Sequence, residues 1–261
     1  MIILPNKDYI ADNNEKIFTY QFLANVGCPV FDSALFEENE HITKENLLKL
    51  KEILNSEYCT VRYQYVKPCI SPVRGGNKSK IDIDELEKRK IDGTQMWLLQ
   101  PIDRTKNVYG INMYVNKKLN SFVIEAVGKG FDVSDINRGD VTPHEIICFD
   151  YPVENGWQNE WWKYITLEFV TQQQFDVDKK NRLNKLKKFG LECNIDIFDE
   201  KYVPLDYALI DKLIHYTDLI DKKWSSSDEY TVSASMDANG KMVFWDIQTP
   251  AGKSKILRRN I

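Results

Sequence analysis

The sequence predicts an α+β fold with mostly antiparallel sheets. Its middle part holds several short segments rich in β-branched and aromatic residues, and no helical pattern separates them. Helical periodicity occurs instead near the start and in the last third of the chain. Near the C-terminal end, Asn239-Gly240 lies between two further segments of strand composition, which is typical of a β-hairpin. Strands that follow one another directly favour antiparallel pairing over alternating βαβ units.

Composition narrows the class of protein. The chain has 261 residues, of which 43% are hydrophobic and 12% aromatic, so it can bury a core as one large domain or two small ones. The net charge of -4 does not favour wholesale electrostatic binding to nucleic acid or to an anionic membrane. We therefore expect no membrane partner, and nucleic acid only if a local basic patch binds it.

Cysteine and histidine usage points to a reducing compartment. The five cysteines are odd in number, scattered and never spaced as C-x-x-C, so neither a disulfide framework nor a cysteine zinc site is expected. The three histidines lack the spacing of a zinc-binding helix. Neither a signal peptide nor a membrane-spanning run of about 20 apolar residues is present. We expect a cytoplasmic protein.

The first elements are read from periodicity and capping. Residues 1 to about 57 are expected to be mainly helical. Within them, 44–54 (KENLLKLKEIL) carries leucine and isoleucine at helical spacing, and Thr43 is a suitable N-cap. The segment 58–66 (YCTVRYQYV) has the composition of a strand.

The later elements are mostly strands. Four further segments have strand composition, namely 96–102, 108–115, 121–127 and 144–150, and 161–170 is expected to be another strand or an amphipathic segment. A basic helix with a solvated face is expected over 179–188, and an amphipathic helix capped by Asp206 over 206–223. In the terminal hairpin, Asn239 and Gly240 are expected to supply the positive φ angles of a tight turn.

A first candidate site follows the strand at 58–66. Arg62 lies on that strand, and a loop with two adjacent glycines carries Arg74 and Lys78. Paired glycines let backbone N–H groups approach a phosphate closely, and arginine and lysine neutralise its charge. The pattern fits a nucleoside triphosphate, and it equally fits a glycine turn with solvated basic residues.

Two polar residues interrupt apolar strands. Gln100 ends the strand at 96–102 and could offer its amide to a purine edge, or simply cap the strand. Glu125 lies inside the strand at 121–127, where a carboxylate must face a cleft or find a partner. The polar stretch between Glu125 and Glu145 is either a functional loop or an ordinary surface excursion.

The terminal hairpin offers a metal site. Asp246 and Gln248 are two residues apart on a strand, so both side chains point to one face. A carboxylate beside an amide oxygen can hold Mg²⁺, which prefers hard oxygen ligands and usually also binds substrate phosphates. The alternative is a strand with one exposed polar face.

Two other patterns compete with these sites. Lys90-Ile-Asp-Gly93 matches the short K-x-D-G motif of covalent nucleotidyltransferases, in which the lysine attacks a nucleotide phosphate. The basic run 179–188 could bind RNA or another anion.

Taken in order, these segments resemble the ATP-grasp superfamily. They are similar to the nucleotide-binding domains of phosphoenolpyruvate synthase, pyruvate phosphate dikinase and rifampin phosphotransferase. The resemblance rests on the following runs: Glu15-Lys16, Gly27-Cys-Pro-Val30, Val61-Arg62, Leu98-Leu-Gln100, Ile124-Glu-Ala-Val-Gly-Lys-Gly130, Gly139-Asp-Val-Thr-Pro143 and the terminal hairpin. The run that starts at Ile124 and continues to Pro143 is the most specific of these.

This resemblance implies two α+β lobes, 1–95 and 96–261, that enclose a nucleotide cleft. It implies ATP and Mg²⁺ as cofactors, and a ligase or phosphotransferase activity on an unknown small-molecule or peptide acceptor. The implied site residues are Lys16, Arg62 and Lys78 at the phosphates, Gln100 at the adenine, Glu125 near the ribose or metal, and Asp246 with Gln248 at Mg²⁺. Arg62 and Arg74 would act in catalysis by neutralising charge on the transferred phosphoryl group.

One departure from the family keeps two alternatives open. The family carries an acidic residue on the first hairpin strand, whereas this chain has Val232-Ser-Ala-Ser235 there. A non-catalytic module that senses nucleotide or binds a protein partner is therefore the first alternative. A covalent nucleotidyltransferase that uses Lys90 is the second.

Overall fold

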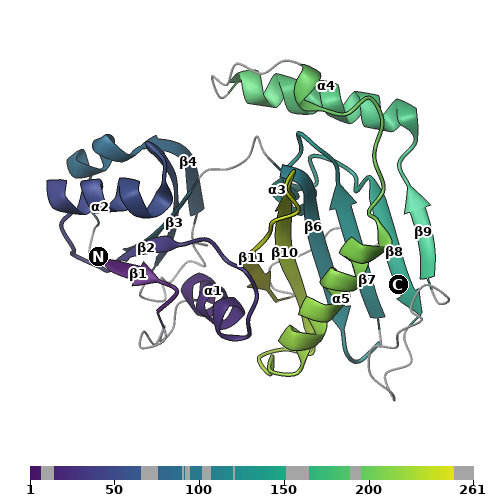
Figure 1. Cartoon of the computed structure of the whole chain (residues 1–261), viewed down its shortest axis with the longest axis horizontal. Helices are drawn as coiled ribbons and strands as arrows, with labels where there is room; N and C mark the ends of the chain where they lie inside the picture. Colours follow the sequence, from purple (N-terminus) through teal and green to yellow (C-terminus); the bar gives the residue numbers. More distant parts are fainter. Residues whose placement is uncertain are drawn as a thin grey trace. The chain divides into compact units, whose positions relative to one another are not determined.

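A computed structural model of the chain describes most of its residues. The described residues are 1–6, 15–65, 76–89, 91, 95–101, 107–119, 121–150, 165–188 and 195–249, without the side chains of 15, 16, 64, 65, 76–80 and 150. The chain divides into two compact units, Met1–Asp103 and Arg104–Ile261 (Figure 1).

The boundary between the units lies later than the sequence analysis places it. A division after residue 95 would cut strand β5 (Gln95–Pro101) from its own sheet, because β5 pairs with strands of the first unit on both sides. The division after Asp103 keeps that sheet whole.

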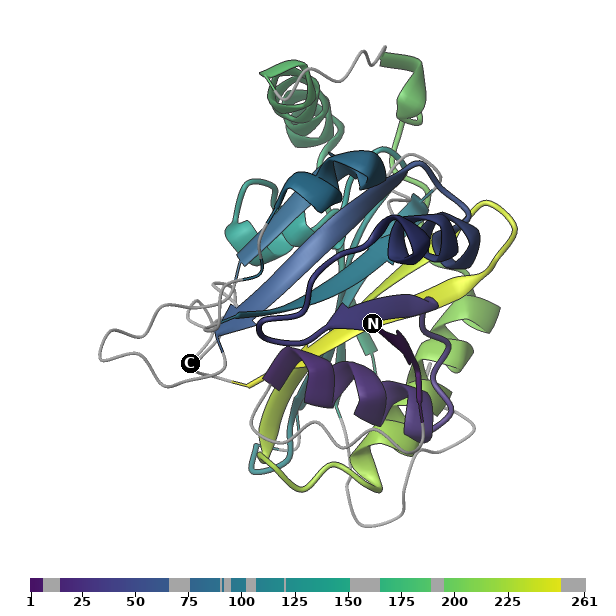
Figure 2. The same cartoon turned by 90° about the vertical axis from the view of Figure 1, so that its left-hand side faces the viewer.

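The first unit is a five-stranded antiparallel sheet with helices, and Figure 2 brings it to the front. Its sheet order is β1-β2-β5-β3-β4, with the strands β1 (Ile2–Leu4), β2 (Ser33–Phe36), β3 (Tyr58–Tyr65), β4 (Gly76–Asp82) and β5. Its helices are α1 (Glu15–Asn25), α2 (Lys44–Leu54) and the short 3-10 helix η1 (Ile83–Lys88).

Alternation along β5 builds two hydrophobic clusters in this unit. Leu98 packs with Ile17 and Tyr20 of α1, whereas its neighbour Leu99 packs with Leu50 of α2. Successive side chains of a strand point to opposite faces, so α1 and α2 cover opposite faces of the sheet.

The strands predicted over 58–66 and 96–102 form as β3 and β5, whereas two other predictions for the first unit are wrong in part. The helix over 44–54 forms, and Thr43 caps it. The expectation of a mainly helical start misses β1 and β2, because β2 is a four-residue strand buried on both faces and shows no alternation. The glycine-rich loop is partly strand, since Gly76 begins β4.

The second unit is a six-stranded antiparallel sheet with three helices. Its sheet order is β11-β10-β6-β7-β8-β9. The strands are β6 (Asn107–Asn116), β7 (Ser121–Val127), β8 (Glu145–Asp150), β9 (Ile165–Phe169), β10 (Glu229–Asp237) and β11 (Met242–Gln248). The helices are α3 (Val133–Arg138), α4 (Gln172–Lys188) and α5 (Tyr207–Asp221), and a 3-10 turn, η4, spans Ile195–Ile197.

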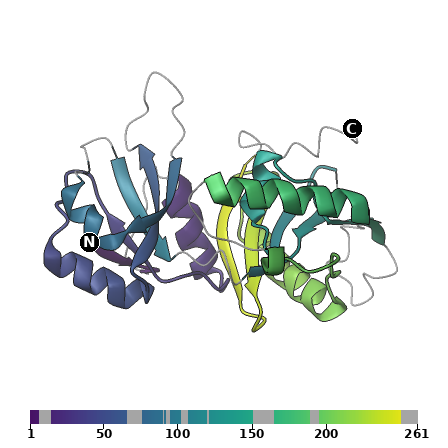
Figure 3. The same ribbon diagram turned by 90° about the horizontal axis from the view of Figure 1, so that it is seen from above.

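Helix α5 covers one face of this sheet, and α4 lies across the strand ends (Figures 1 and 3). The predicted N-cap is confirmed, because the Asp206 carboxylate accepts a hydrogen bond from the Leu209 N–H group. Thr217 of α5 lies against Met113 of β6, and Tyr216 packs edge-on against Phe244 of β11.

The terminal hairpin forms as predicted, but its turn differs. Gly240 has a φ of 73°, whereas Asn239 does not adopt a positive φ. Instead, the Asp237 carboxylate accepts hydrogen bonds from the N–H groups of Asn239 and Lys241. The longer loop needs only one left-handed residue, which glycine supplies.

The described part of the chain has no membrane-spanning helix, and its cysteines are free thiols. None of the helices described here is long and apolar enough to cross a membrane. Cys28, Cys59 and Cys148 have free thiols. Cys69 and Cys193 lie outside the described residues.

The cap of α2 generates a stability prediction. Thr43 and Asn46 form a reciprocal pair, in which each side chain accepts a hydrogen bond from the backbone N–H group of the other. Thr43→Ala removes one half of this pair and should lower the free energy of unfolding by about 1 kcal/mol in urea denaturation. Thr43→Ser keeps the hydroxyl and is the control. Equal stability of Thr43→Ala and wild type would contradict this role of the cap.

Candidate functional site

A row of buried polar side chains crosses the sheet of the second unit. Glu125 of β7 pairs with Asn112 of β6, Asn112 pairs with Ser233 of β10, and Ser233 pairs with Asp246 of β11. Directly opposed residues of antiparallel strands lie on the same face, so the four side chains form one line. Each is between 1% and 6% exposed. We call these four residues the polar row.

The local sequence explains why the row forms. In β6, Ile111 and Met113 flank Asn112, and in β10, Val232 and Ala234 flank Ser233. These apolar neighbours are buried on the α5 side of the sheet, and the period of two places the polar residues on the other face.

A β-bulge sets the position of Asp246. The pairing of β10 with β11 shifts between Ser233 and Ala234, so that Ala234 faces Phe244 and Ser233 faces Asp246. Trp245 is the extra residue, and its indole N–H group donates to the Ser235 hydroxyl at 2.8 Å. Bulges of this kind re-aim side chains. Here the bulge brings Asp246 into line with the rest of the polar row.

Helix α3 lies over the polar row through Asn137. Its Oδ1 accepts a hydrogen bond from Asn112 Nδ2 at 2.8 Å, and its Nδ2 donates to Ser233 Oγ at 3.4 Å. Ser233 Oγ in turn donates to Asn112 Oδ1 at 3.0 Å. These three side chains, Asn112, Asn137 and Ser233, form a closed ring of hydrogen bonds, which we call the amide ring.

Glu125 has an unusual protonation equilibrium. Burial raises its pKa from the ordinary value of 4.5 to about 7, and a hydrogen bond from Asn112 partly opposes the rise. Near neutral pH the carboxyl group is therefore present in both forms. A cation or hydrogen-bond donor that reaches it would draw it to the charged form.

The geometry of the row separates its two carboxylates. Strands are about 4.8 Å apart, so Glu125 and Asp246 are about 14 Å apart along three strand spacings. Oxygen ligands of Mg²⁺ lie about 2.1 Å from the ion, and the two groups therefore do not share one ion. The resemblance allows Glu125 to bind either the ribose or the metal. This distance favours binding of the ribose, because an Mg²⁺ ion at Asp246 would lie too far from Glu125.

The Asp246 end of the polar row could hold an Mg²⁺ ion that also binds substrate phosphates. Asp246 lies opposite Ser233, and Gln248 lies opposite Thr231 in the same regular register. The Asp246 carboxylate and the Gln248 amide therefore lie on the same face of the sheet. In the described part of the chain, no three His, Cys, Asp or Glu side chains gather in a way that could hold a metal ion. Mg²⁺ that spans substrate phosphates needs only one or two carboxylates, and this donor set suits that mode.

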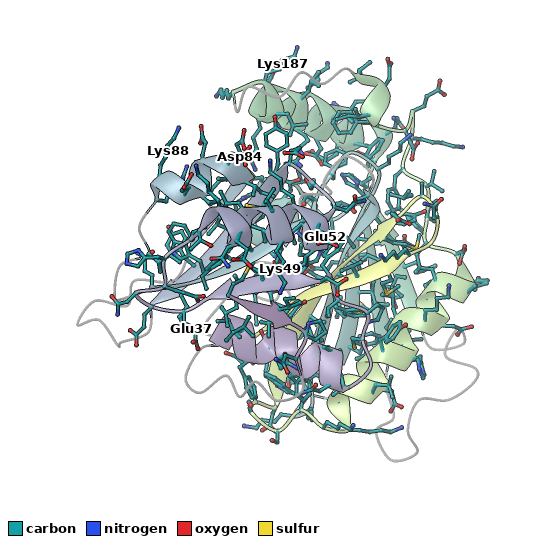
Figure 4. All side chains as sticks on the ribbon, turned by 60° about the vertical axis from the view of Figure 1, so that its left-hand side comes forward. Glu37, Lys49, Glu52, Asp84, Lys88 and Lys187 are labelled. Atoms are coloured by element: carbon teal, nitrogen blue, oxygen red, sulfur yellow. The ribbon has the colours of Figure 1, made fainter. Side chains whose placement is uncertain are left out.

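The basic run of α4 has a structural role that the sequence analysis missed. Arg182 is buried and donates to the Asp135 carboxylate of α3 at 2.8 Å, and Lys185 binds the same carboxylate at 3.2 Å. Lys179 donates to backbone carbonyls of Asp199 and Glu200. The prediction of a wholly solvated face is therefore wrong, although Lys187 does point outward (Figure 4).

The polar stretch before Glu145 serves mainly to build the fold. His144 is fully buried among Phe131, Phe175 and Tyr202. Its Nδ1 accepts a hydrogen bond from the Gly128 N–H group, so the ring carries its proton on Nε2. Burial lowers the pKa of His144 below its usual value, with a smaller opposing effect of Asp178.

Glu145 anchors the chain that leads into α5. Its carboxylate accepts hydrogen bonds from the Tyr202 hydroxyl at 2.6 Å and from the Leu205 N–H group at 2.9 Å. The stretch from Asp132 to Glu145, open in sequence to a functional or a surface role, thus supplies caps, ion pairs and anchors.

The first unit holds the remaining candidate residues. Arg62 is half-buried on β3, opposite Leu98 and Asn77. Gln100 donates to the Ser33 hydroxyl at 3.4 Å, and its buried Oε1 has no hydrogen-bond partner among the described residues.

Three lysines and Arg74 are not described at side-chain level. Lys16 lies on α1, and Lys78 lies on β4 opposite Val61. Arg74 and Lys90 lie outside the described residues. The phosphate-binding roles of Lys16, Lys78 and Arg74, and the role of Lys90 as a nucleophile, therefore remain predictions.

Sequence reasoning missed Asn112, Asn137 and Ser233. Asn112 carries a signal of the kind used for Glu125, since it is a polar residue inside an apolar strand. Asn137 and Ser233 carry no comparable signal, because only the folded chain brings them to Asn112.

Comparisons with known proteins give likenesses of fold only. No protein-family model and no curated protein sequence matches the chain. Similar solved structures include the D-alanine-D-alanine ligase from Coxiella burnetii (14% identity, TM-score 0.46, 93% of this chain and 49% of that chain). Others are the ATP-grasp ligase PsnB complexed with minimal precursor (10%, 0.38, 90% and 51%) and the macrocyclase MdnC bound with precursor peptide MdnA from Microcystis aeruginosa (11%, 0.36, 89% and 51%). The chain spans about half the length of these structures. At these TM-scores the likeness carries no argument about activity.

The protonation of Glu125 predicts a pH dependence of stability. The pKa is about 7 in the folded chain and 4.5 ordinarily, so the folded chain binds more protons between these values. The free energy of unfolding should therefore fall as pH rises from about 4.5 to about 7, by about 3 kcal/mol for this group.

Glu125→Gln should abolish this part of the pH dependence in urea denaturation. Glu38→Gln, a substitution at an exposed glutamate, should leave the slope unchanged. A slope that is the same in wild type and Glu125→Gln would show that Glu125 does not titrate in this range.

Proposed function

We propose that the chain is an ATP-dependent ligase or phosphotransferase of the ATP-grasp type that uses Mg²⁺. The polar row carries the proposal, because it brings two residues of the resemblance onto one buried line of side chains. Glu125 and Asp246 belong to it, and Gln248 continues the face on which Asp246 lies. The narrower resemblance to phosphoenolpyruvate synthase and its relatives rests on the sequence runs alone.

In this proposal, the second unit binds the ribose and the metal. Glu125 would accept hydrogen bonds from ribose hydroxyls, which its charged form does best. Asp246 and Gln248 would hold Mg²⁺ by their oxygen atoms. The ion would neutralise charge on the phosphates.

The first unit supplies the roles that the resemblance assigns. Gln100 would bind the adenine edge. Its amide oxygen has no partner among the described residues and suits the adenine amino group, which is a hydrogen-bond donor. Lys16, Arg62 and Lys78 would bind phosphate oxygens. Arg62 and Arg74 would neutralise charge as the γ-phosphoryl group leaves ADP. The acceptor, a small molecule or a peptide, would attack that phosphorus, and a carboxylate acceptor would become an acyl phosphate.

One observation favours the alternative of a nucleotide-sensing or partner-binding module. Ser233 faces Asp246 across the hairpin and is already engaged with Asn112 and Asn137, so the hairpin offers a single carboxylate at this point. A module of this kind would bind nucleotide with little dependence on Mg²⁺ and would form no product. The nucleotidyltransferase alternative rests on Lys90, which lies outside the described residues.

Asp246→Asn tests the metal role. Wild type should show a higher melting temperature with ATP, and Mg²⁺ should increase the shift, since ligand at 100 times Kd stabilises the native state by about 2.7 kcal/mol. Asp246→Asn should keep the shift with ATP alone and lose the Mg²⁺-dependent part. Asp228→Asn makes the same charge change at an exposed ion pair with Lys118 and is the control.

Product analysis distinguishes the ligase or phosphotransferase from the sensing module and from the nucleotidyltransferase. Phosphorus NMR with Mg·ATP and the low-molecular-weight fraction of a cell extract should show ADP formation that Arg62→Ala abolishes. ATP binding without any product and without Mg²⁺ dependence would favour the sensing module. A mass increase equal to AMP on the intact protein, lost in Lys90→Ala, would favour the nucleotidyltransferase. No shift with any nucleotide would contradict the proposal.

A further inference from the structure

Asn137 is the α3 side chain that reaches into the polar row from above. It is half-exposed, and it contacts two strands at once through Asn112 and Ser233. Neither of its partners is a charged group, and among the described residues the Asn137 side chain makes no hydrogen bond to Glu125. Its effect on Glu125 must therefore pass through the amide ring.

The amide ring fixes which way round the Asn112 side chain lies. An asparagine amide has an oxygen that only accepts and an NH₂ group that only donates. Ser233 donates its hydroxyl proton to Asn112 Oδ1, and Asn137 Oδ1 accepts from Asn112 Nδ2. If the Asn112 amide alone were turned over, its oxygen would face Asn137 Oδ1 and both contacts would be lost. If Asn137 turned with it, the Asn112 oxygen would face the Glu125 carboxylate, which has no proton to donate when it is charged. Glu125 lies directly opposite Asn112 on the neighbouring strand, and the hydrogen bond from Asn112 that lowers its pKa requires this NH₂ group as the donor.

Contacts with the sheet and with α4 fix the position of α3, and therefore the position of Asn137 over Asn112. A Cβ atom on Gly110 of β6 would lie 2.5 Å from the Val133 backbone nitrogen, so glycine permits the close approach of the helix to the sheet. Asp132 caps the helix in a reciprocal pair with Asp135. Arg182 and Lys185 of α4 then bind the Asp135 carboxylate. Through these contacts the basic run of α4 supports the helix that carries Asn137.

We propose that Asn137 is a positioning residue for nucleotide binding, which acts through Asn112 to keep a hydrogen-bond donor on Glu125. It touches no nucleotide itself. The inference rests on the proposed function, since it takes Glu125 as a nucleotide ligand. It assigns to α3 a role that goes beyond covering the sheet.

A double-mutant cycle tests this inference. Affinity for Mg·ADP is measured by calorimetry in wild type, Asn137→Ala, Glu125→Gln and the double variant. Each single substitution should weaken binding about tenfold, because each removes the oriented pair at Glu125. The double variant should bind as Glu125→Gln does, since Asn137 acts on binding through the carboxylate that this substitution removes. The coupling is then about 1.4 kcal/mol between residues that do not touch.

A purely structural role would give a different result. Effects that multiply to about a hundredfold in the double variant would overturn the inference, as would unchanged affinity in Asn137→Ala. Ser134→Ala lies on the same helix and pairs only with Asp132 and Arg138 in the recorded hydrogen bonds, so it should bind as wild type does. Asn137→Ser, which is too short to reach Asn112, repeats the cycle if Asn137→Ala does not fold.

The cycle also separates this inference from the proposed function. If wild type binds no nucleotide, the proposed function fails and the inference fails with it. If wild type binds Mg·ADP and Asn137→Ala binds equally well, only the inference fails.

Discussion

The hydrogen bond between Asn112 and Glu125 is the interaction on which the rest of the second unit's polar face depends. A carboxylate buried to this extent is unfavourable unless donors surround it. Asn112 is such a donor, and Ser233 and Asn137 hold its amide in the orientation that donates. The partial compensation leaves the pKa of Glu125 at about 7, so the group remains responsive to a ligand. Groups poised in this way are common at functional sites.

Two local irregularities of the chain support the polar row and the helix that lies over it. The β-bulge between Ser233 and Ala234 aligns Asp246 with the row, although it interrupts the regular ladder. Gly110 allows α3 to approach the sheet, although glycine weakens a strand. A regular ladder in place of the bulge, or a larger residue in place of Gly110, would be the more favourable choice for the strand alone. Such departures are expected where a fold supports a site.

The sequence predicted the elements that have strong local signals. The helix over 44–54 follows from leucine spacing and a cap, and the terminal hairpin follows from its turn residues. The strand β2 was missed because burial on both faces removes alternation. Glu125 was predicted from its place inside an apolar strand, and Asp246 from its spacing of two residues to Gln248. Their alignment could not be predicted, since it depends on strand order and on a bulge that leaves no pattern in the sequence.

The central claim is that the polar row binds nucleotide, with the metal at Asp246 and the sugar at Glu125. The most direct measurement is paramagnetic broadening of amide signals by Mn²⁺·ADP in NMR spectra of the deuterated protein. The account predicts the strongest broadening at Asp246 and Gln248, weaker broadening about 14 Å away at Glu125, and none that is specific to Gln174 on α4. Broadening that is strongest on α4, or equal over the whole surface, would contradict it.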